Sequence, residues 1–305
     1  MAKGAYLLGC LLALAAIAPS HAGVKNSPTV EELKPKALAG DINAQLTLGG
    51  DYDAGNGVRQ DRKEAFKWYE MAASAGNDIA LNAVGSLYLE GSGVRQDYAK
   101  ALEYFQRAAS RGNRNAECSL GLMHDNGWGV PQNPVEANAW YRKAAAHGDP
   151  DAMYNLGLSY VAGSGVAADE TLAFQWFEKA ANLGQPGAQL KAGYALYNGR
   201  GVAKDPGQAV AWYRQAAVHG NIEAIANIGL AYRDGQGVPL DLVEAFAWLD
   251  VARFITQHTD DMRTKWGIRG ELDELKKRMS RSDLKAGEAR SRQLYENLRA
   301  GISHS

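Results

Sequence analysis

The chain has 305 residues, 46% of them hydrophobic, and its 33 Lys and Arg nearly balance 34 Asp and Glu. This near-neutral charge argues against a nucleic-acid-binding protein, which needs a basic surface. Beyond the first 22 residues, no stretch has the roughly 20 consecutive apolar residues of a membrane-spanning helix.

The first 22 residues read as a secretory signal peptide. Lys3 supplies the basic start, residues 5–17 form an apolar run, and Ser20, His21 and Ala22 form a small-x-small cleavage site. Cleavage after Ala22 predicts a periplasmic or secreted protein with no membrane span in the mature chain. A membrane anchor is the alternative, although the apolar run is short for one. A lipid on Cys10 is another, although few residues precede that cysteine.

Residues 23–40 predict a linker followed by an N-terminal capping helix. The end of this stretch resembles the second half of a repeat, with Gly40 in the place of the terminal glycine. Pro35 is expected to limit how far this helix extends, because proline lacks the backbone N–H that a helix interior uses.

Residues 41–256 contain six copies of a 36-residue unit, marked by a Gly-x-Gly-Val motif that recurs without insertion or deletion. Self-similarity at a fixed period of this length is typical of repeat proteins. In the second half of the first unit, Ala65, Trp68, Tyr69 and Ala72 have the i, i+3, i+4, i+7 spacing of one helical face. Each unit therefore predicts two helices, and the chain predicts an all-α, α/α solenoid of six helix-turn-helix repeats.

The joints between the expected helices carry glycine and capping residues. The second loop glycine of each unit is expected to take a positive φ and to be structural: Gly57, Gly93, Gly129, Gly165, Gly201 and Gly237. An N-cap acceptor then precedes each second helix: Asp61, Asp97, Asn133, Asp169, Asp205 and Asp241. Pro134 and Pro206 follow directly, at the first helical position that suits proline.

Two further positions predict how the helices pack. A glycine recurs inside each first helix, as at Gly49, where it costs roughly 1 kcal/mol against alanine, so a close backbone approach is expected to offset it. A tryptophan or tyrosine recurs in each second helix and is expected to be a buried, structural residue. Tyr104 is the tyrosine of this series, and the tryptophans are Trp68, Trp140, Trp176, Trp212 and Trp248.

The whole pattern resembles the Sel1-like repeat, a relative of the tetratricopeptide repeat. It reads Ala-x-x-x-(Leu/Val/Ala/Ile)-Gly-x-x-Tyr, then Gly-x-Gly-Val-x-x-Asp, then Ala-x-x-Trp-(Tyr/Phe)-x-x-Ala-Ala-x-x-Gly. The resemblance implies a solenoid whose concave face binds another protein. His124 and Leu196 replace the usual tyrosine of the first helix. Thr256 replaces the final glycine of the sixth unit, as expected of a unit that leads into a cap.

Residues 257–305 break the period and predict C-terminal capping helices. Residues 271–279 are expected to be helical, and Ser280 with Asp283 is expected to start another helix that reaches about Leu298. The segment 253–305 is basic, with 12 Lys and Arg against 8 Asp and Glu. A solvated polar cap is the favoured interpretation, because a solenoid needs one for solubility, and a docking site is the alternative.

A search for chemistry yields little. Ser282 and Lys285 match Ser-x-x-Lys, the nucleophile motif of penicillin-recognising enzymes, but the companion Ser-Asp-Asn and Lys-Thr-Gly motifs are missing from the sequence. Asp51 and Asp53 precede a glycine-rich turn, but the residues that follow them do not supply the other ligands of a calcium-binding loop. The sequence predicts no cofactor and no metal. A β-lactam-binding or hydrolysing enzyme of the Sel1-like type remains the first alternative function.

The favoured function is a non-enzymatic scaffold or adaptor that binds an unidentified protein, with roles such as envelope assembly, signalling or host contact. Binding is expected where the repeats differ. Asn155, Lys191 and Asn227 share one varied position of the first helix and predict an exposed polar row. Trp128 and Tyr197 are predicted as exposed aromatic residues. They also supply the second alternative, a carbohydrate- or peptidoglycan-binding module.

Overall fold

The computed structural model describes residues 28–256 and 262–302, with side chains for 28–256 and 267–301. The expected signal peptide, its cleavage site and Cys10 therefore lie outside the described residues. The chain forms two compact units, Met1–Ala167 and Ala168–Ser305. Every regular element in the described ranges is an α-helix. None of these described helices combines the length and the apolar character that a membrane span requires.

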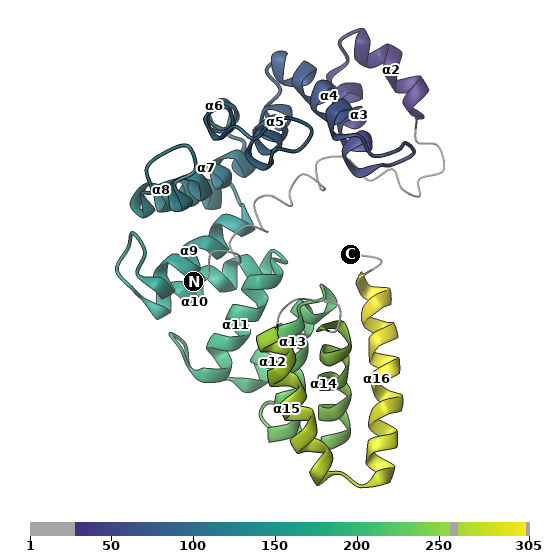
Figure 1. Cartoon of the computed structure of the whole chain (residues 1–305). Coiled ribbons are helices and arrows are strands. Elements are labelled where there is room, and N and C mark those ends of the chain that lie inside the picture. The colour runs from purple at the N-terminus through teal and green to yellow at the C-terminus, as the bar shows by residue number, and fades with distance from the viewer. Residues whose placement is uncertain (1–27, 257–261, 303–305) are drawn as a thin grey trace. The chain divides into compact units, whose positions relative to one another are not determined.

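The helices follow the 36-residue period of the sequence. The first unit contains α2 (Val30–Leu38), α3 (Ile42–Ala54), α4 (Arg62–Ser74), α5 (Asp78–Glu90), α6 (Tyr98–Ala109), α7 (Arg114–Asn126), α8 (Pro134–Ala146) and α9 (Pro150–Ala162). The second contains α10 (Glu170–Asn182), α11 (Pro186–Asn198), α12 (Pro206–Val218), α13 (Ile222–Asp234), α14 (Leu242–Thr256), α15 (Met262–Arg278) and α16 (Arg281–Ile302). Within each unit the repeat helices pack against their neighbours in chain order (Figure 1). The prediction of an all-α fold built from six helix-pair repeats is confirmed.

The helix ends use the residues that the sequence predicts. The first helix ends at a glycine in the left-handed region, such as Gly55 with φ 78° and Gly91 with φ 73°. The second helix begins at an Asp or Asn whose side chain accepts from the backbone of the first turn, as Asp97 Oδ1 does from Lys100 N at 3.0 Å. Pro134 and Pro206 lie in the first turns of α8 and α12. These caps satisfy backbone N–H groups that have no partner inside the helix.

The second loop glycine has a packing role in addition to its positive φ. A Cβ on Gly93 would overlap the backbone carbonyl of Arg62, at the start of the second helix of the preceding repeat. In the same way, a Cβ on Gly201 would overlap the Glu170 backbone, and one on Gly237 would overlap the Pro206 backbone. A Cβ on Gly57 would meet nothing within 4 Å. The glycine loop therefore links consecutive repeats, and the first loop lacks that contact.

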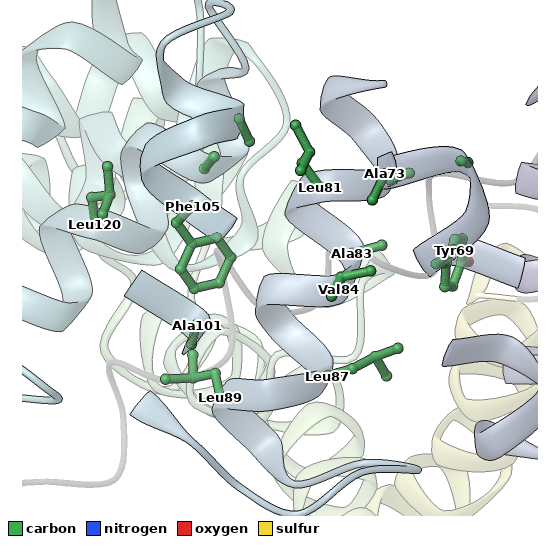
Figure 2. Close-up of a cluster of buried hydrophobic side chains, with 14 of the residues drawn as sticks. Tyr69, Ala73, Leu81, Ala83, Val84, Leu87, Leu89, Ala101, Phe105 and Leu120 are labelled. Carbon is green, nitrogen blue, oxygen red and sulfur yellow. The ribbon is translucent and has the colours of Figure 1, made fainter. Parts of the chain in front are cut away.

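The mid-helix glycines allow an aromatic ring to approach the first helix. A Cβ on Gly49 would lie 2.6 Å from the Tyr69 ring, and one on Gly85 would lie 2.7 Å from the Phe105 ring. Figure 2 shows Tyr69, Phe105 and the apolar side chains of α5 gathered in one cluster of buried residues. The sequence predicted a close backbone approach here, and the structure shows instead that an aromatic ring fills the space beside each of these glycines.

The buried aromatic is the residue after the tryptophan series. This residue is at most 3% exposed in five repeats: Tyr69, Phe105, Tyr141, Phe177 and Tyr213. Trp140, Trp176 and Trp212 are only half-buried, whereas Trp68 and Trp248 are 2% and 4% exposed. The expectation of a buried tryptophan is therefore confirmed at Trp68 and Trp248 and wrong at Trp140, Trp176 and Trp212. Lys143 and Lys179 lie over the rings of Trp140 and Trp176, with Nζ 4.1 and 4.5 Å from the ring centroids.

The two ends differ from the repeats. At the N-terminal end, α2 begins with a capping box formed by Thr29 and Glu32, contains Pro35 and packs on α3. At the C-terminal end, α15 begins at Met262, earlier than expected, and α16 begins after Ser280 and continues to Ile302. Both α15 and α16 pack on α14, and Figure 1 shows α14 between them.

Candidate functional site

Asn155 does not lie on an exposed polar row. Its side chain on α9 is 7% exposed, and its Nδ2 lies 4.0 Å from the sulfur of Cys118 on α7. The same varied position is also buried at Ala83 and Ser119. The first helices α7 and α9 of consecutive repeats contact each other in this unit. The varied position therefore packs between first helices here and does not face solvent. The expectation of a solvent-facing residue at 155 was wrong.

Lys191 and Asn227 lie in the second unit and are partly exposed. Lys191 shares a face of α11 with Tyr194, three residues later, which is 44% exposed. Asn227 shares the equivalent face of α13 with Leu230, which is also partly exposed. We call these four residues the first-helix stripe: Lys191, Tyr194, Asn227 and Leu230. The stripe combines a cation, an amide and two large apolar groups, which suits contact with another polypeptide.

The two predicted aromatic candidates are less accessible than expected. The Trp128 ring stacks on Tyr98, with centroids 6.2 Å apart and planes inclined by 12°, and it packs against the buried cluster of the first unit. Tyr197 is half-buried, with its ring centroid 6.5 Å from that of Tyr213. Burial raises the pKa of Tyr197 above its ordinary value. One face of the Trp128 ring is therefore occupied, which leaves less surface for stacking on a sugar.

The C-terminal helices enclose a cleft that no sequence pattern indicated. It has a volume of about 690 Å³ and lies in the second unit among α14, α15 and α16. We call it the C-terminal cleft. Its lining combines apolar, cationic and acidic residues: Phe246, Asp250, Arg253, Thr256, Arg269, Leu272, Asp273, Lys276, Glu288 and Arg292. The basic composition of the tail is the only sequence signal that pointed to this region.

The residues of the Ser-x-x-Lys motif take part in the start of α16. The Ser280 hydroxyl accepts from Asp283 N at 3.1 Å, and the Ser282 hydroxyl lies 2.7 Å from it. Lys285 is exposed on the same helix. Across the described ranges, no group of three or more His, Cys, Asp or Glu side chains is arranged to hold a metal ion.

One joint of the first unit buries charged groups. Asp149 caps α9, is 4% exposed and accepts from Ala152 N at 2.7 Å. Its burial raises the pKa to about 6, and the nearby Asp151 adds to the shift. The buried Glu117 carboxylate lies 2.7 Å from Nδ1 of His147, which ends the preceding helix. Asn77, Asn113 and Asn221 fill the place of Asp149 in other repeats, so the charge is not required for the cap.

Consecutive helix pairs with glycine loops and a repeated Gly–aromatic contact define an α/α solenoid repeat protein. The Sel1 repeat family model matches residues 42–77, 78–113, 114–149, 150–185, 186–221 and 222–252. Because these matches cover most of the chain, the chain belongs to the Sel1 repeat family. Proteins of this family are generally scaffolds for protein–protein interaction.

Solved structures of the same kind resemble this chain. The crystal structure of a Sel1 repeat protein from Oxalobacter formigenes is 36% identical, with a TM-score of 0.65 and coverage of 74% of this chain and 100% of that one. The structure of c5321, a protective antigen present in uropathogenic Escherichia coli strains, is 26% identical over 90% of this chain and 81% of that one, with a TM-score of 0.44. No curated protein sequence matches this chain at a significant level.

Proposed function

We propose that this chain is a non-enzymatic, exported scaffold that binds a segment of another protein along the first-helix stripe. The observation that carries this proposal is that Tyr194 is exposed, and Lys191, Asn227 and Leu230 are partly exposed, in a repeat array whose invariant positions serve packing. A solenoid repeats its core residues, whereas recognition of one partner requires residues that differ between repeats.

The stripe indicates what kind of segment it binds. Tyr194 and Leu230 offer apolar contact area, and tyrosine contributes such area at low conformational cost. Lys191 and Asn227 offer hydrogen-bond donors, and Lys191 adds a positive charge. An extended segment with alternating apolar and acidic or polar side chains satisfies all four residues.

Affinity capture from envelope extracts tests the proposal. We compare the wild type with the stripe variant Lys191→Gln/Tyr194→Ala/Asn227→Ala. The control variant Lys285→Gln/Gln175→Ala/Gln208→Ala makes matched changes at exposed positions elsewhere in the second unit. Exposed substitutions usually change stability by less than about 0.5 kcal/mol, so both variants are expected to fold. The stripe variant is expected to bind the captured partner at least about tenfold more weakly, and the control to bind as the wild type does. Equal binding by all three proteins would contradict the proposal.

Export is a separate part of the proposal and rests on residues 1–22 of the sequence. Mass spectrometry of the exported protein is expected to find a chain that begins near Gly23. An intact N-terminus, a lipid on Cys10 or retention in the cytoplasm would each overturn this part.

The two alternative functions gain no support from the described residues. The hydroxyl of Ser282 is adjacent to that of Ser280 at the start of α16, a position that serves the helix cap. The Trp128 ring is stacked on Tyr98 and packs against the core cluster. Neither observation favours β-lactam chemistry or sugar binding over protein binding.

A further inference from the structure

The C-terminal cleft contains two guanidinium groups that have no partner among the residues that the structure describes. Asp250 is fully engaged, because Oδ1 accepts from Arg253 Nη2 at 2.7 Å and Oδ2 accepts from the Ser291 hydroxyl at 2.8 Å. Lys276 and Asp273 form an ion pair at 4.0 Å. Arg269 and Arg292 have no ion pair or hydrogen bond with any described residue. Glu288 is the one lining carboxylate that is likewise unpaired among the described residues.

The two unpaired arginines of the cleft lie on different helices. Arg269 projects from α15 and Arg292 from α16, and both helices pack on α14. Phe246 and Leu272, which are 3% and 1% exposed, form part of the lining beneath the charged groups. The hydrogen bond from the Ser291 hydroxyl to Asp250 joins α16 to α14 at the cleft, and Arg253 holds the Asp250 carboxylate from within α14.

We propose that the C-terminal cleft binds an acidic segment of a protein partner, with Arg269 and Arg292 each receiving a carboxylate. A guanidinium group pairs with a carboxylate through two parallel N–H···O bonds, which gives both strength and orientation. The volume of about 690 Å³ is far larger than the roughly 30 Å³ that one water molecule occupies. A cleft of this size holds several residues and their apolar side chains, which makes a peptide a better match than a single small anion.

This site is separate from the first-helix stripe and rests on the proposed function only in assuming that the ligand is a protein. The stripe variant changes no residue that lines the cleft, so its result tests only the stripe. The cleft variant changes no residue of the stripe, so its result tests only the cleft. The two outcomes are therefore distinguishable.

Fluorescence anisotropy with a labelled octapeptide of alternating Asp and Leu tests the cleft directly. The double variant Arg269→Gln/Arg292→Gln is expected to weaken binding at least about tenfold. The control variant Arg281→Gln/Lys285→Gln removes the same charge from exposed positions of α16 that do not line the cleft. It is expected to stay within about twofold of the wild type. Glu288→Gln is expected to tighten binding, because it removes the unpaired carboxylate.

Two further measurements test whether the cleft recognises carboxylates of a peptide in particular. An octapeptide with Asn in place of Asp is expected not to bind, and equal binding of this peptide would overturn the role of the carboxylates. Inorganic phosphate at constant ionic strength is expected not to displace the acidic peptide, and its displacement by phosphate would reduce the cleft to a general anion site. Equal weakening by the cleft variant and the control would show that net charge alone attracts the peptide, which also overturns the proposal. Circular dichroism of each variant verifies the fold.

Discussion

The repeats and the C-terminal helices are held together by different contacts. In repeats such as the fifth, a glycine on the first helix contacts a buried ring on the second, as Gly193 contacts Tyr213, whereas in the sixth Gly229 contacts Leu249. Between α14 and α16, one contact of that kind persists, where Gly287 meets Phe246. The other contacts that join these helices include ion pairs and hydrogen bonds, such as Arg290 Nε to Glu244 Oε1 at 2.6 Å. Contacts of the first kind depend on shape, while partly exposed ion pairs weaken with salt.

The largest expected effect is a difference in stability between loss of the buried ring and loss of the tryptophan before it. Tyr213→Ala removes a side chain that is 1% exposed and is expected to lower the free energy of unfolding by roughly 3–5 kcal/mol. Trp212→Ala removes a half-buried ring and is expected to cost about 1–2 kcal/mol. Urea unfolding of the two variants measures the difference. Equal losses would mean that the tryptophan series contributes as much to the core as the ring behind it.

The loop glycines provide a matched pair of substitutions. Gly57→Ala and Gly93→Ala both place a Cβ at a positive φ, of 68° and 74°, which costs about 1 kcal/mol. Only the Cβ on Gly93 also overlaps the Arg62 backbone, so Gly93→Ala is expected to cost about 2–4 kcal/mol in total. Thermal and urea unfolding compare the two proteins. A similar loss in both would show that the contact between loop and preceding repeat contributes nothing to stability.

Asp149 introduces a buried charge into one repeat joint and makes that joint sensitive to pH. Its pKa is raised to about 6 by burial, above the ordinary value of 3.8, so ionisation destabilises the folded state. The penalty is complete above pH 6, decreases as the pH falls and is absent below about pH 4. Asp149→Asn is therefore expected to stabilise the protein by about 1–3 kcal/mol near pH 7.5 and to have little effect near pH 4. Urea unfolding at both pH values checks this, and a variant that is less stable than the wild type at pH 7.5 would refute it.

The C-terminal ion pairs are expected to give the smallest effect. The side chains of Arg290 and Glu244 are 36% and 20% exposed. Arg290→Gln breaks their ion pair and is expected to lower the free energy of unfolding by about 1 kcal/mol or less. Hydrogen exchange is expected to show faster exchange in α16 and no change in α11. About 1 M NaCl is expected to produce the same pattern in the wild type. Salt-independent exchange of α16 would mean that its apolar contacts alone hold it.

Much of the fold follows from the sequence because one period controls it. The N-caps such as Asp97, the loop glycines and the first-turn prolines each mark a helix end, and they recur in phase. The choice between Trp212 and Tyr213 could not be made in this way. Both residues fall within the broad apolar face of the second helix, and it is the contact of Tyr213 with Gly193 on the neighbouring helix that shows which ring is buried.

The candidate site was harder to predict for a different physical reason. Comparison of the repeats finds positions that vary, but variation does not establish exposure. Asn155 and Lys191 share one repeat position, yet the first is buried beside Cys118 and the second is partly exposed. The C-terminal cleft forms where α14 of the sixth repeat meets α15 and α16, which lie outside the period, so comparison of the repeats could not bring its lining residues together.

Photo-crosslinking tests the central claim most directly, namely that the first-helix stripe is the protein-binding surface. A photoreactive phenylalanine analogue replaces Tyr194 in one protein and the exposed Gln175 of α10 in another. Irradiation of each protein in envelope extracts is expected to give a discrete crosslinked partner from position 194 and none from position 175. Adding Lys191→Gln and Asn227→Ala is expected to abolish that product. A partner that crosslinks equally from both positions, or a product from 194 that survives the added substitutions, would contradict the account.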